Sequence, residues 1–594
     1  MNDENMQTTG KLEKDAVKRR AYGNVVFAIS LGIVVFLVVI CAIFPDGFYA
    51  ATTAACDFVT DTFGWYYLLL VTLIIFGSLI FIFSPIGAIH LGDPGSKPEY
   101  STISWIAMLF SAGMGIGLIF WGSAQPLSFY ASSAPEAPVG SQQALLDAFK
   151  YSFFHWGISA WTIYALVALA IAYFRFRKKE TFLLSSTLKP LFGDRVYGWL
   201  GKLVDVITTL ATILGVATSL GLGAMQINGG LSYLFGVPNC LPVQIGIIIV
   251  TTCCFIASAV SGIGRGLKHL SNINVILACC LMAICMVVGP ANTMLNTFVD
   301  TLGTYMQDFL RLTLHIAPFD STERSWIGSW TIFYWAWWIA WSPFVGIFIA
   351  RISRGRTIRQ FVVGVILVPA VFSFLWFSVF GVLSTNVQMN GFDLTQLATE
   401  EVLFGTLSHY PLGFGLSILA IILVFTFFIT SADSATFVLG MISEGGTLNP
   451  RNSTKVIWGI MLAAISIVLL MAGGLNALQN VLILGALPFS VVLILMMVSL
   501  MQELIYERYK MGLYIKPEKL PERDRPFRSY EEGDEKGVPA EVVFEAIRAD
   551  RLREEAVAQQ TEADRDQKAD DGLTGDSQDS EEGASSKPGG QDKS

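Results

Sequence analysis

Runs of about twenty consecutive apolar residues recur along most of this chain, and they constrain its fold more than any other feature. A run of that length spans the hydrocarbon core of a bilayer as an α-helix. Of the 594 residues, 53% are hydrophobic and 14% are charged, whereas a soluble globular chain has about a quarter charged residues. We therefore predict an all-α integral membrane protein.

The apolar runs predict twelve transmembrane spans. Their expected limits are 24–44, 65–88, 103–122, 146–174, 199–224, 243–262, 270–290, 328–350, 360–384, 412–440, 454–473 and 478–504. A stretch at 293–314 alternates apolar and polar residues at helical spacing and contains charged residues, which predicts an interfacial helix instead of a span. We thus expect a twelve-helix membrane domain at 24–504, a short segment at 1–23 before it, and a polar, largely disordered tail at 505–594.

Lysine and arginine residues gather in alternate loops, which predicts the orientation. They cluster at 18–20, 175–179, 265–268 and 351–359, whereas the loops at 123–144, 225–241, 385–410 and 474–477 contain none. Only the 291–327 segment departs from this pattern, with Arg311 and Arg324. Because cytoplasmic loops carry the excess of basic residues, we expect both termini in the cytoplasm. No basic footprint for nucleic acid is present in the sequence.

The third expected span contains a glycine motif, Ser111-Ala-Gly-Met-Gly-Ile-Gly117. Three glycines at alternate positions weaken a regular helix and expose backbone amides and carbonyls. Irregular backbone at membrane depth is tolerated where it lines a cavity or is buried in protein. Close helix packing through small residues is the alternative explanation. A dinucleotide-binding motif is excluded, because no strand precedes the glycines and Leu118 stands at the sixth position.

Tryptophans are concentrated in the eighth expected span, in Tyr334-Trp-Ala-Trp-Trp-Ile-Ala-Trp-Ser-Pro343. Trp337, Trp338 and Trp341 share one side of a helix by their spacing. We expect Pro343 to break that helix. An aromatic belt at the membrane interface is the alternative.

A second aromatic set lies in the fourth expected span, with Trp156, Trp161 and Tyr164 close to one helix face. Stacked aromatic faces suit a cation without N–H donors, such as a trimethylammonium group, because ring quadrupoles attract it by up to about 2 kcal/mol each when desolvated. The sequence therefore predicts a site for a quaternary-ammonium compound.

The tenth expected span contains Thr430, Ser431 and Asp433. Hydroxyl and carbonyl oxygens are hard ligands that suit a small cation. The two hydroxyls could instead bond back to their own helix. An ionisable residue inside an apolar run, such as Asp433, is a functional candidate.

Taken together, these motifs resemble the betaine/carnitine/choline transporter family. The glycine motif, the His155-Trp-Gly string, the tryptophan string followed by Arg351-Ile-Ser-Arg-Gly-Arg356, and the Thr-Ser-Ala-Asp string occur in the family's order over about residues 20–505. The resemblance implies a LeuT-type core of two inverted five-helix repeats, spans three to seven and eight to twelve. The glycine-rich third span and the Trp/Pro-rich eighth span then occupy matching first positions, where interrupted helices point to a midplane site.

The resemblance also implies the residues of the site. For the substrate they are Trp337, Trp338 and Trp341, with Trp156, Trp161 and Tyr164 along its path, Ser219 near its carboxylate, and Gly113 and Gly115 of the glycine motif. For one sodium ion they are Ser111, Met114, Phe427, Thr430 and Ser431. The family further suggests a homotrimer with the 293–314 helix in the subunit contacts.

Two positions and the C-terminal tail differ from patterns within the family. Thr212 and Phe344 match a second sodium site of sodium-coupled relatives, but Val216 replaces the other threonine and offers no side-chain oxygen. Gly117 stands where some choline-carrying relatives have an acidic residue, which predicts a preference for zwitterions. The tail at 560–594 is predominantly acidic, whereas the betaine osmosensor of the family has a basic tail, so anionic lipid would repel this segment.

The leading hypothesis is a sodium-coupled symporter for glycine betaine or a related osmolyte, with sodium as coupling ion and no cofactor. The alternatives are a sodium-independent exchanger or proton-coupled carrier of carnitine- or choline-type substrates, and a transporter-like sensor or channel. The retained Met114, Thr430 and Ser431 favour sodium. An enzyme is not expected, because the spans contain no nucleophile–base pair, metal-ligand cluster or nucleotide motif.

Overall fold

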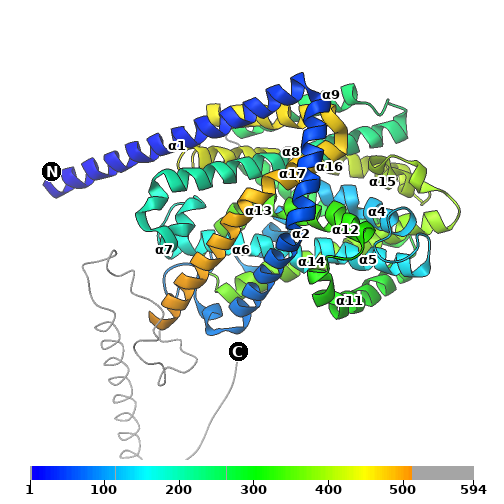
Figure 1. The fold of residues 1–594 in the computed structure, drawn as a ribbon, viewed down its shortest axis with the longest axis horizontal. Coiled ribbons are helices and arrows are strands. Elements are labelled where there is room, and N and C mark those ends of the chain that lie inside the picture. The colour runs from blue at the N-terminus through cyan, green and yellow to red at the C-terminus, as the bar shows by residue number, and fades with distance from the viewer. Residues whose placement is uncertain (1–2, 114, 262–263, 511–594) are drawn as a thin grey trace, which may run out of the picture. The chain divides into compact units, whose positions relative to one another are not determined.

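The chain is all-helical in the computed structural model (Figure 1), which confirms the predicted fold class. The structure describes residues 3–113, 115–261 and 264–510. The chain divides into a unit Met1–Ile505 and a unit Tyr506–Ser594, and the helices that matter for function belong to the first. Within the described residues the only β-type pairing is an isolated bridge between His90 and Thr357.

The α-helices follow one another as α1 (Asp3–Ile43), α2 (Pro45–Phe83), α3 (Thr102–Gly113), α4 (Ile116–Ala131), α5 (Gln142–Trp156), α6 (Ile158–Phe176), α7 (Lys189–Phe192), α8 (Trp199–Phe235), α9 (Leu241–Ser261), α10 (Gly264–Val288), α11 (Ala291–Leu314), α12 (Ser321–Ile327), α13 (Phe333–Arg351), α14 (Ile358–Met389), α15 (Val402–Leu407), α16 (Gly413–Ser443) and α17 (Asn452–Lys510). A single π-helical turn, η4 (Gly328–Ile332), joins α12 to α13.

Ten helical segments among the described residues are long and apolar enough to cross a membrane. The predicted third span is missing from these ten because it is divided into α3 and α4, each too short to cross a membrane by itself. The eleventh and twelfth spans are counted once because α17 contains both, with non-helical backbone at Gly473 and Gly474 between them. The number twelve therefore stays a prediction.

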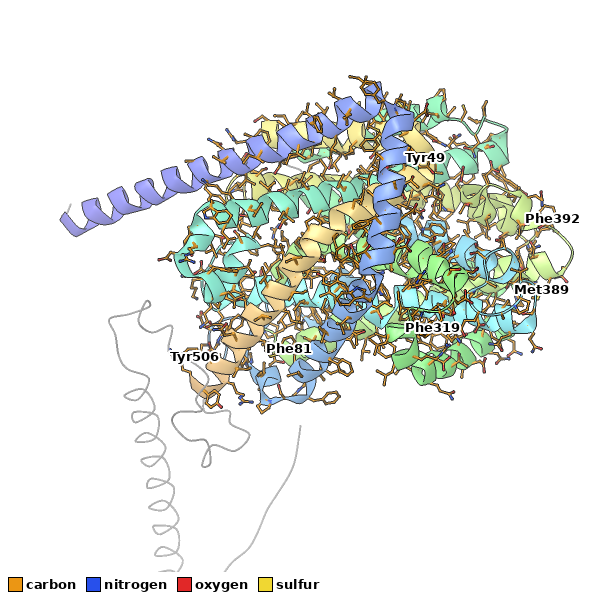
Figure 2. All side chains as sticks on the ribbon, in the orientation of Figure 1. Tyr49, Phe81, Phe319, Met389, Phe392 and Tyr506 are labelled. Atoms are coloured by element: carbon orange, nitrogen blue, oxygen red, sulfur yellow. The ribbon has the colours of Figure 1, made fainter. Side chains whose placement is uncertain are left out.

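The most enclosed spans form the centre of the Met1–Ile505 unit. The α5–α6 segment is 94% buried over its apolar window and the α12–α13 segment is 89% buried, whereas α1 and α10 are only 22% and 28% buried. Large apolar side chains such as Phe36 and Phe83 are exposed on α1 and α2, and a surface of this kind needs a covering such as lipid. Figure 2 shows the side chains between the ribbons and labels Phe81 and Phe319. Phe81 is buried, whereas Phe319 is exposed.

The main helix contacts follow a reciprocal pattern. The most extensive ones pair α13 with α6, α16 with α8, and α14 with α4. In the predicted order of spans, the first helix of each five-helix repeat packs on the second helix of the other, and the two third helices pack together. Two repeats related by a pseudo-two-fold axis produce this reciprocity.

Helix breaks agree with the sequence prediction at one position and differ at two. The glycine motif does interrupt the third span, since α3 ends at Gly113 and α4 begins at Ile116. The fourth span has a break that we did not predict, at Gly157 between α5 and α6. A Cβ atom at Gly157 would lie 2.4 Å from Cε1 of Phe374, so this close approach requires glycine.

The predicted break at Pro343 is wrong, because α13 continues through this residue to Arg351. A proline cannot donate the helical hydrogen bond to the carbonyl four residues earlier, here that of Ile339. The hydroxyl of Ser342 donates to the Ile339 carbonyl instead, at 2.7 Å. The side chain next to the proline thus satisfies the acceptor that the proline leaves free.

The expected helix at 293–314 is present as α11. It is tied to the core by Lys150, which bonds Asp308 at 3.0 Å, and by Arg311, which bonds Glu136 at 2.9 Å. Burial raises the pKa of Glu136, but hydrogen bonds from Arg311 and Tyr151 outweigh it and lower the pKa below its ordinary value. Glu136 is therefore held as a carboxylate at neutral pH.

Candidate functional site

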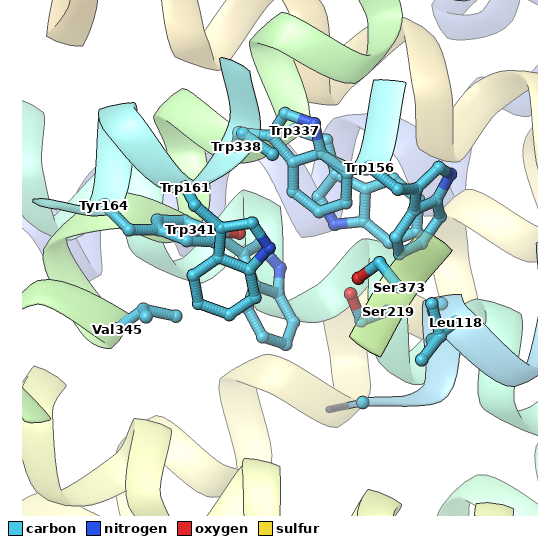
Figure 3. A pocket seen from close by; sticks show the side chains of 13 residues that line it. Leu118, Trp156, Trp161, Tyr164, Ser219, Trp337, Trp338, Trp341, Val345 and Ser373 are labelled. Atoms are coloured by element: carbon cyan, nitrogen blue, oxygen red, sulfur yellow. The ribbon is translucent and has the colours of Figure 1, made fainter. Parts of the chain in front are cut away.

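An aromatic cavity lies where α4, α5, α6, α8, α13 and α14 meet (Figure 3). Its volume is about 40 Å³. The lining residues are Gly115, Gly117, Leu118, Trp156, Ala160, Trp161, Tyr164, Ser219, Trp337, Trp338, Trp341, Val345 and Ser373. Eight of the nine residues predicted to bind substrate are among them, and the ninth, Gly113, is the last residue of α3. The structure therefore brings together motifs that lie more than 200 positions apart in the sequence.

The rings in this cavity present both faces and edges. Trp337 and Trp338 are stacked nearly parallel, with centroids 5.3 Å apart and planes 9° apart. Trp156 lies edge-on to Trp338, with ring centroids 4.9 Å apart and planes at 72°. Tyr164 also lies edge-on to Trp338, with centroids 6.1 Å apart and planes at 76°. These aromatic side chains are 6% exposed or less. We refer to Trp156, Trp161, Tyr164, Trp337, Trp338 and Trp341 as the aromatic box.

Three indoles of the aromatic box are anchored through their ring nitrogens. The Nε1 atoms of Trp156, Trp338 and Trp341 donate to Gln125 Oε1 at 2.9 Å, to the His155 carbonyl at 2.9 Å and to the Gly215 carbonyl at 2.8 Å, respectively. Each acceptor belongs to a different helix from its indole. A hydrogen bond at the ring edge fixes the plane while leaving the π-face free for a cation.

Sequence reasoning did not single out Gln125 or Gly215, and it quoted His155 only as part of a motif. Gln125 lies in an ordinary apolar stretch of α4, eight residues after the end of the glycine motif. No local spacing reveals its role, because its partners lie on α5 and α13. Ser373 of α14 was missed for the same reason.

Gly117 is required by the packing of two indoles. A Cβ atom at this position would lie 2.7 Å from Cη2 of Trp337 and 3.1 Å from Cη2 of Trp156. Both atoms belong to rigid bicyclic rings that are themselves buried. An acidic side chain at Gly117 would therefore displace the rings before its charge could act on a substrate.

We expect Gly117→Ala to weaken ligand binding by about tenfold, because one added methyl group forces Trp337 and Trp156 apart, and overpacking costs about 1–3 kcal/mol. The dissociation constant, measured by tryptophan fluorescence, checks this. Gly246→Ala on α9 is the matched control, because nothing lies within 4 Å of an added Cβ there. Equal affinities for wild type and Gly117→Ala would contradict the packing argument.

The predicted sodium residues of the tenth span lie on α16. The Thr430 hydroxyl donates towards the carbonyls of Thr426 and Phe427, at 3.1 and 3.2 Å, so the back-bonded arrangement is the one observed. Thr430 Oγ1 also accepts from Nδ2 of Asn274 on α10, at 3.3 Å. Asn274 is 1% exposed, and its Oδ1 has no partner among the described residues. Ser431 is half-buried beside Thr430.

Two further predicted sodium ligands lie wholly or partly outside the described residues. Met114 lies outside the described residues, and so does the side chain of Ser111. Phe427, whose backbone carbonyl already accepts from Thr430, is buried at 3% exposure. Around Thr430 the structure places the Phe427 carbonyl and the Asn274 side chain within hydrogen-bond distance of its hydroxyl.

The residues that the family resemblance implied for a second sodium ion, Thr212 and Phe344, lie on α8 and α13, which pack together. Thr212 donates its hydroxyl proton to the Thr208 carbonyl at 2.7 Å, so its oxygen lone pairs stay available. Val216 is fully buried one turn further on, and Phe344 is 7% exposed. Val216 thus supplies no side-chain oxygen next to that of Thr212, as the sequence predicted.

Asp433, the ionisable residue singled out in the tenth span, does not line the aromatic cavity. Its Oδ2 accepts a hydrogen bond of 2.6 Å from the Ser258 hydroxyl of α9. The contact joins two helices at a buried position, which fits a structural role as well as a functional one.

Comparison with known proteins agrees with the motifs and the cavity. A family model described as "BCCT, betaine/carnitine/choline family transporter" matches residues 25–509. The chain belongs to this family. The family consists of transporters, so the expectation that the chain is not an enzyme is confirmed.

Individual BCCT relatives match over most of their length. The chain is 56% identical over 484 residues to "Glycine betaine transporter OpuD" of Bacillus subtilis (strain 168), covering 81% of this chain and 94% of that protein. It is 44% identical over 488 residues to an "Ectoine/hydroxyectoine transporter" of Virgibacillus pantothenticus, covering 81% and 97%. A solved substrate-bound, outward-open Na+-coupled sialic acid symporter matches with a TM-score of 0.41 and 16% identity, covering 71% of this chain and 85% of that one.

Proposed function

We propose that this BCCT transporter imports a quaternary-ammonium zwitterion of the glycine betaine type, driven by sodium, through alternating access. The observation that carries the proposal is a cavity lined by aromatic faces and by no charged side chain among the described residues. The high identity to a glycine betaine transporter supports the same substrate class.

The lining matches the two ends of such a zwitterion. The trimethylammonium end has no N–H donor, so ring faces such as those of Trp337 and Trp338 hold it. The carboxylate end needs donors, and the cavity offers the hydroxyls of Ser219 and Ser373, both drawn towards the cavity in Figure 3. Because the zwitterion supplies its own counter-charge, the lining needs no acidic residue.

The size of the cavity supports a transport cycle with moving parts. One water molecule requires roughly 10–15 Å³ on this measure, so about 40 Å³ holds only a few waters. Glycine betaine, with eight non-hydrogen atoms, would enter only if the rings move apart. The helix interruptions at Gly113–Gly115 and at Gly157 adjoin the aromatic box and give α3 and α5 places to bend.

We assign the coupling ion to the Thr430 and Ser431 region of α16. Because the Thr430 hydroxyl donates its proton to a carbonyl of its own helix, the lone pairs of Oγ1 can coordinate a cation. Asn274 Oδ1, which has no hydrogen-bond partner among the described residues, adds a second hard oxygen nearby. Ser111 and Met114 of the interrupted third span would complete the set through backbone oxygens, as in the family.

The test is uptake by the purified protein in proteoliposomes. A labelled panel of betaine, choline, carnitine, ectoine and a sulfonium analogue is offered with and without an inward sodium gradient. We expect concentrative betaine uptake only with the gradient. Equal uptake in both conditions would replace the symporter with a sodium-independent exchanger, and uptake driven by a proton gradient alone would indicate proton coupling.

The same panel tests charge selectivity. We predict that betaine competes for uptake at least tenfold better than choline, because choline carries a net charge that no lining residue balances. Competition curves against labelled betaine measure the ratio. Better competition by choline would show that a negative group outside the described lining reaches the substrate.

We also propose a homotrimer in the bacterial inner membrane with both termini cytoplasmic. The support is the basic-loop asymmetry and the family's assembly. Chemical cross-linking in native membranes and cysteine accessibility at the two termini test these points. The predicted disordered tail lies almost entirely outside the described residues.

A further inference from the structure

We propose that Gln125 is the positioning residue of the aromatic box, a role that deepens the proposed function and rests on it. Gln125 is fully buried on α4, and it does not line the cavity. Its carboxamide nevertheless contacts groups from α5 and α13, the two helices that carry Trp156 and the tryptophan motif.

The orientation of the carboxamide follows from its partners. Its Oε1 accepts from Trp156 Nε1 at 2.9 Å and from the Tyr334 hydroxyl at 2.6 Å. An indole nitrogen is only a donor, so the oxygen and not the amide nitrogen of Gln125 must face Trp156. The reversed amide would place two donors against each other.

This orientation also sets the tautomer of His155. The Nε2 of Gln125 is a donor and lies 3.2 Å from His155 Nδ1, which must therefore accept. The ring proton is then on Nε2 of His155, from which it donates to the Thr331 hydroxyl at 3.0 Å. The backbone carbonyl of the same histidine accepts from Trp338 at 2.9 Å.

Tyr334 transmits the constraint to the stacked pair. The centroid of its ring lies 6.1 Å from that of Trp337, with the planes 16° apart, and 5.9 Å from that of Trp338, with the planes 22° apart. It also stacks on His155, at 4.8 Å and 25°. One carboxamide thus orients Trp156 directly and the Trp337–Trp338 stack through Tyr334, and cation–π attraction depends on where these faces point.

The experiment compares Gln125→Leu, Gln125→Glu and a matched control, Gln226→Leu. Gln226 is 1% exposed on α8, does not line the cavity, and its Oε1 has no partner among the described residues. Near-UV circular dichroism of the full-length protein without ligand reports the tryptophan environment. Tryptophan fluorescence titrated with glycine betaine gives the dissociation constant.

We expect Gln125→Leu to raise the dissociation constant about 10- to 100-fold and to alter the ligand-free spectrum, since it leaves two buried donors without an acceptor. Gln226→Leu should do neither. Gln125→Glu in its protonated form, which a buried position favours, keeps an acceptor oxygen for Trp156 and Tyr334 and an O–H donor for His155 Nδ1, so its affinity should stay within about fivefold of wild type.

The proposal is overturned if folded Gln125→Leu binds as wild type, if Gln125→Leu and Gln226→Leu are impaired equally, or if Gln125→Glu is as weak as Gln125→Leu. Wild-type protein that binds no glycine betaine would refute the proposed substrate instead. In that case the ligand-free spectra still decide whether Gln125 orders the tryptophans.

Discussion

Replacing both Thr430 and Ser431 with alanine should abolish sodium-driven accumulation of glycine betaine, which is the largest effect we expect for this chain. One sodium ion entering down a tenfold gradient and a 100 mV potential releases about 3.7 kcal/mol, of which the potential supplies about 2.3 kcal/mol. That energy sustains about a 500-fold accumulation of a neutral zwitterion. Without the ion, uptake falls to equilibration, and exchange of internal for external substrate should continue in part.

A matched control is available one turn away on the same helix. Thr426 also donates its hydroxyl back to α16, to the carbonyls of Ile422 and Leu423, so Thr426→Ala removes a similar hydroxyl without touching the assigned ion position. We expect normal accumulation in this variant. Full accumulation by the Thr430/Ser431 double variant would remove the assignment.

The sodium-to-substrate ratio, measured from reversal potentials, examines the second position. Val216 removes one hydroxyl there, so we expect a single sodium and only a mild defect in Thr212→Ala. A ratio of two would permit more than a hundred-thousandfold accumulation. It would show that the position around Thr212 and Phe344 still binds sodium, with another oxygen in place of the missing threonine.

Features that depend on local composition were predictable from the sequence. Apolar runs report directly on burial in lipid, and the interruption at Gly113–Gly115 follows from glycines that weaken any helix. The aromatic box was predictable because its members lie in two short strings with helical spacing. That the two strings meet in one cavity was predicted by the family resemblance, because neither string alone indicates its partner.

The remaining features depend on contacts between distant segments. The break between α5 and α6 requires glycine at position 157 because Phe374, more than 200 positions away, occupies the space of a side chain. Pro343 fails to break one because Ser342 replaces the lost donor. Gln125 has no signature in its own helix, since its importance lies in donors from α5 and α13.

Replacing Trp338 with leucine should weaken glycine betaine binding about 10- to 100-fold, and Trp341→Leu should act similarly. Leucine keeps apolar bulk but removes the ring quadrupole, which contributes about 1–3 kcal/mol at a desolvated position. Trp338 also contributes through its stack on Trp337 and its edge contact with Trp156. Trp338→Phe should fall between wild type and leucine, because it retains a smaller aromatic face.

Trp458→Leu on α17 separates ligand recognition from the general cost of losing a buried tryptophan. Trp458 is fully buried and donates to the Ser443 hydroxyl at 2.9 Å, but it does not line the cavity. We expect this variant to lose thermal stability while its dissociation constant for betaine stays close to wild type. Wild-type affinity in both box variants, with normal folding, would show that the substrate binds elsewhere. Loss of affinity in Trp458→Leu equal to that in Trp338→Leu would mean that stability and not cation–π attraction explains the effect.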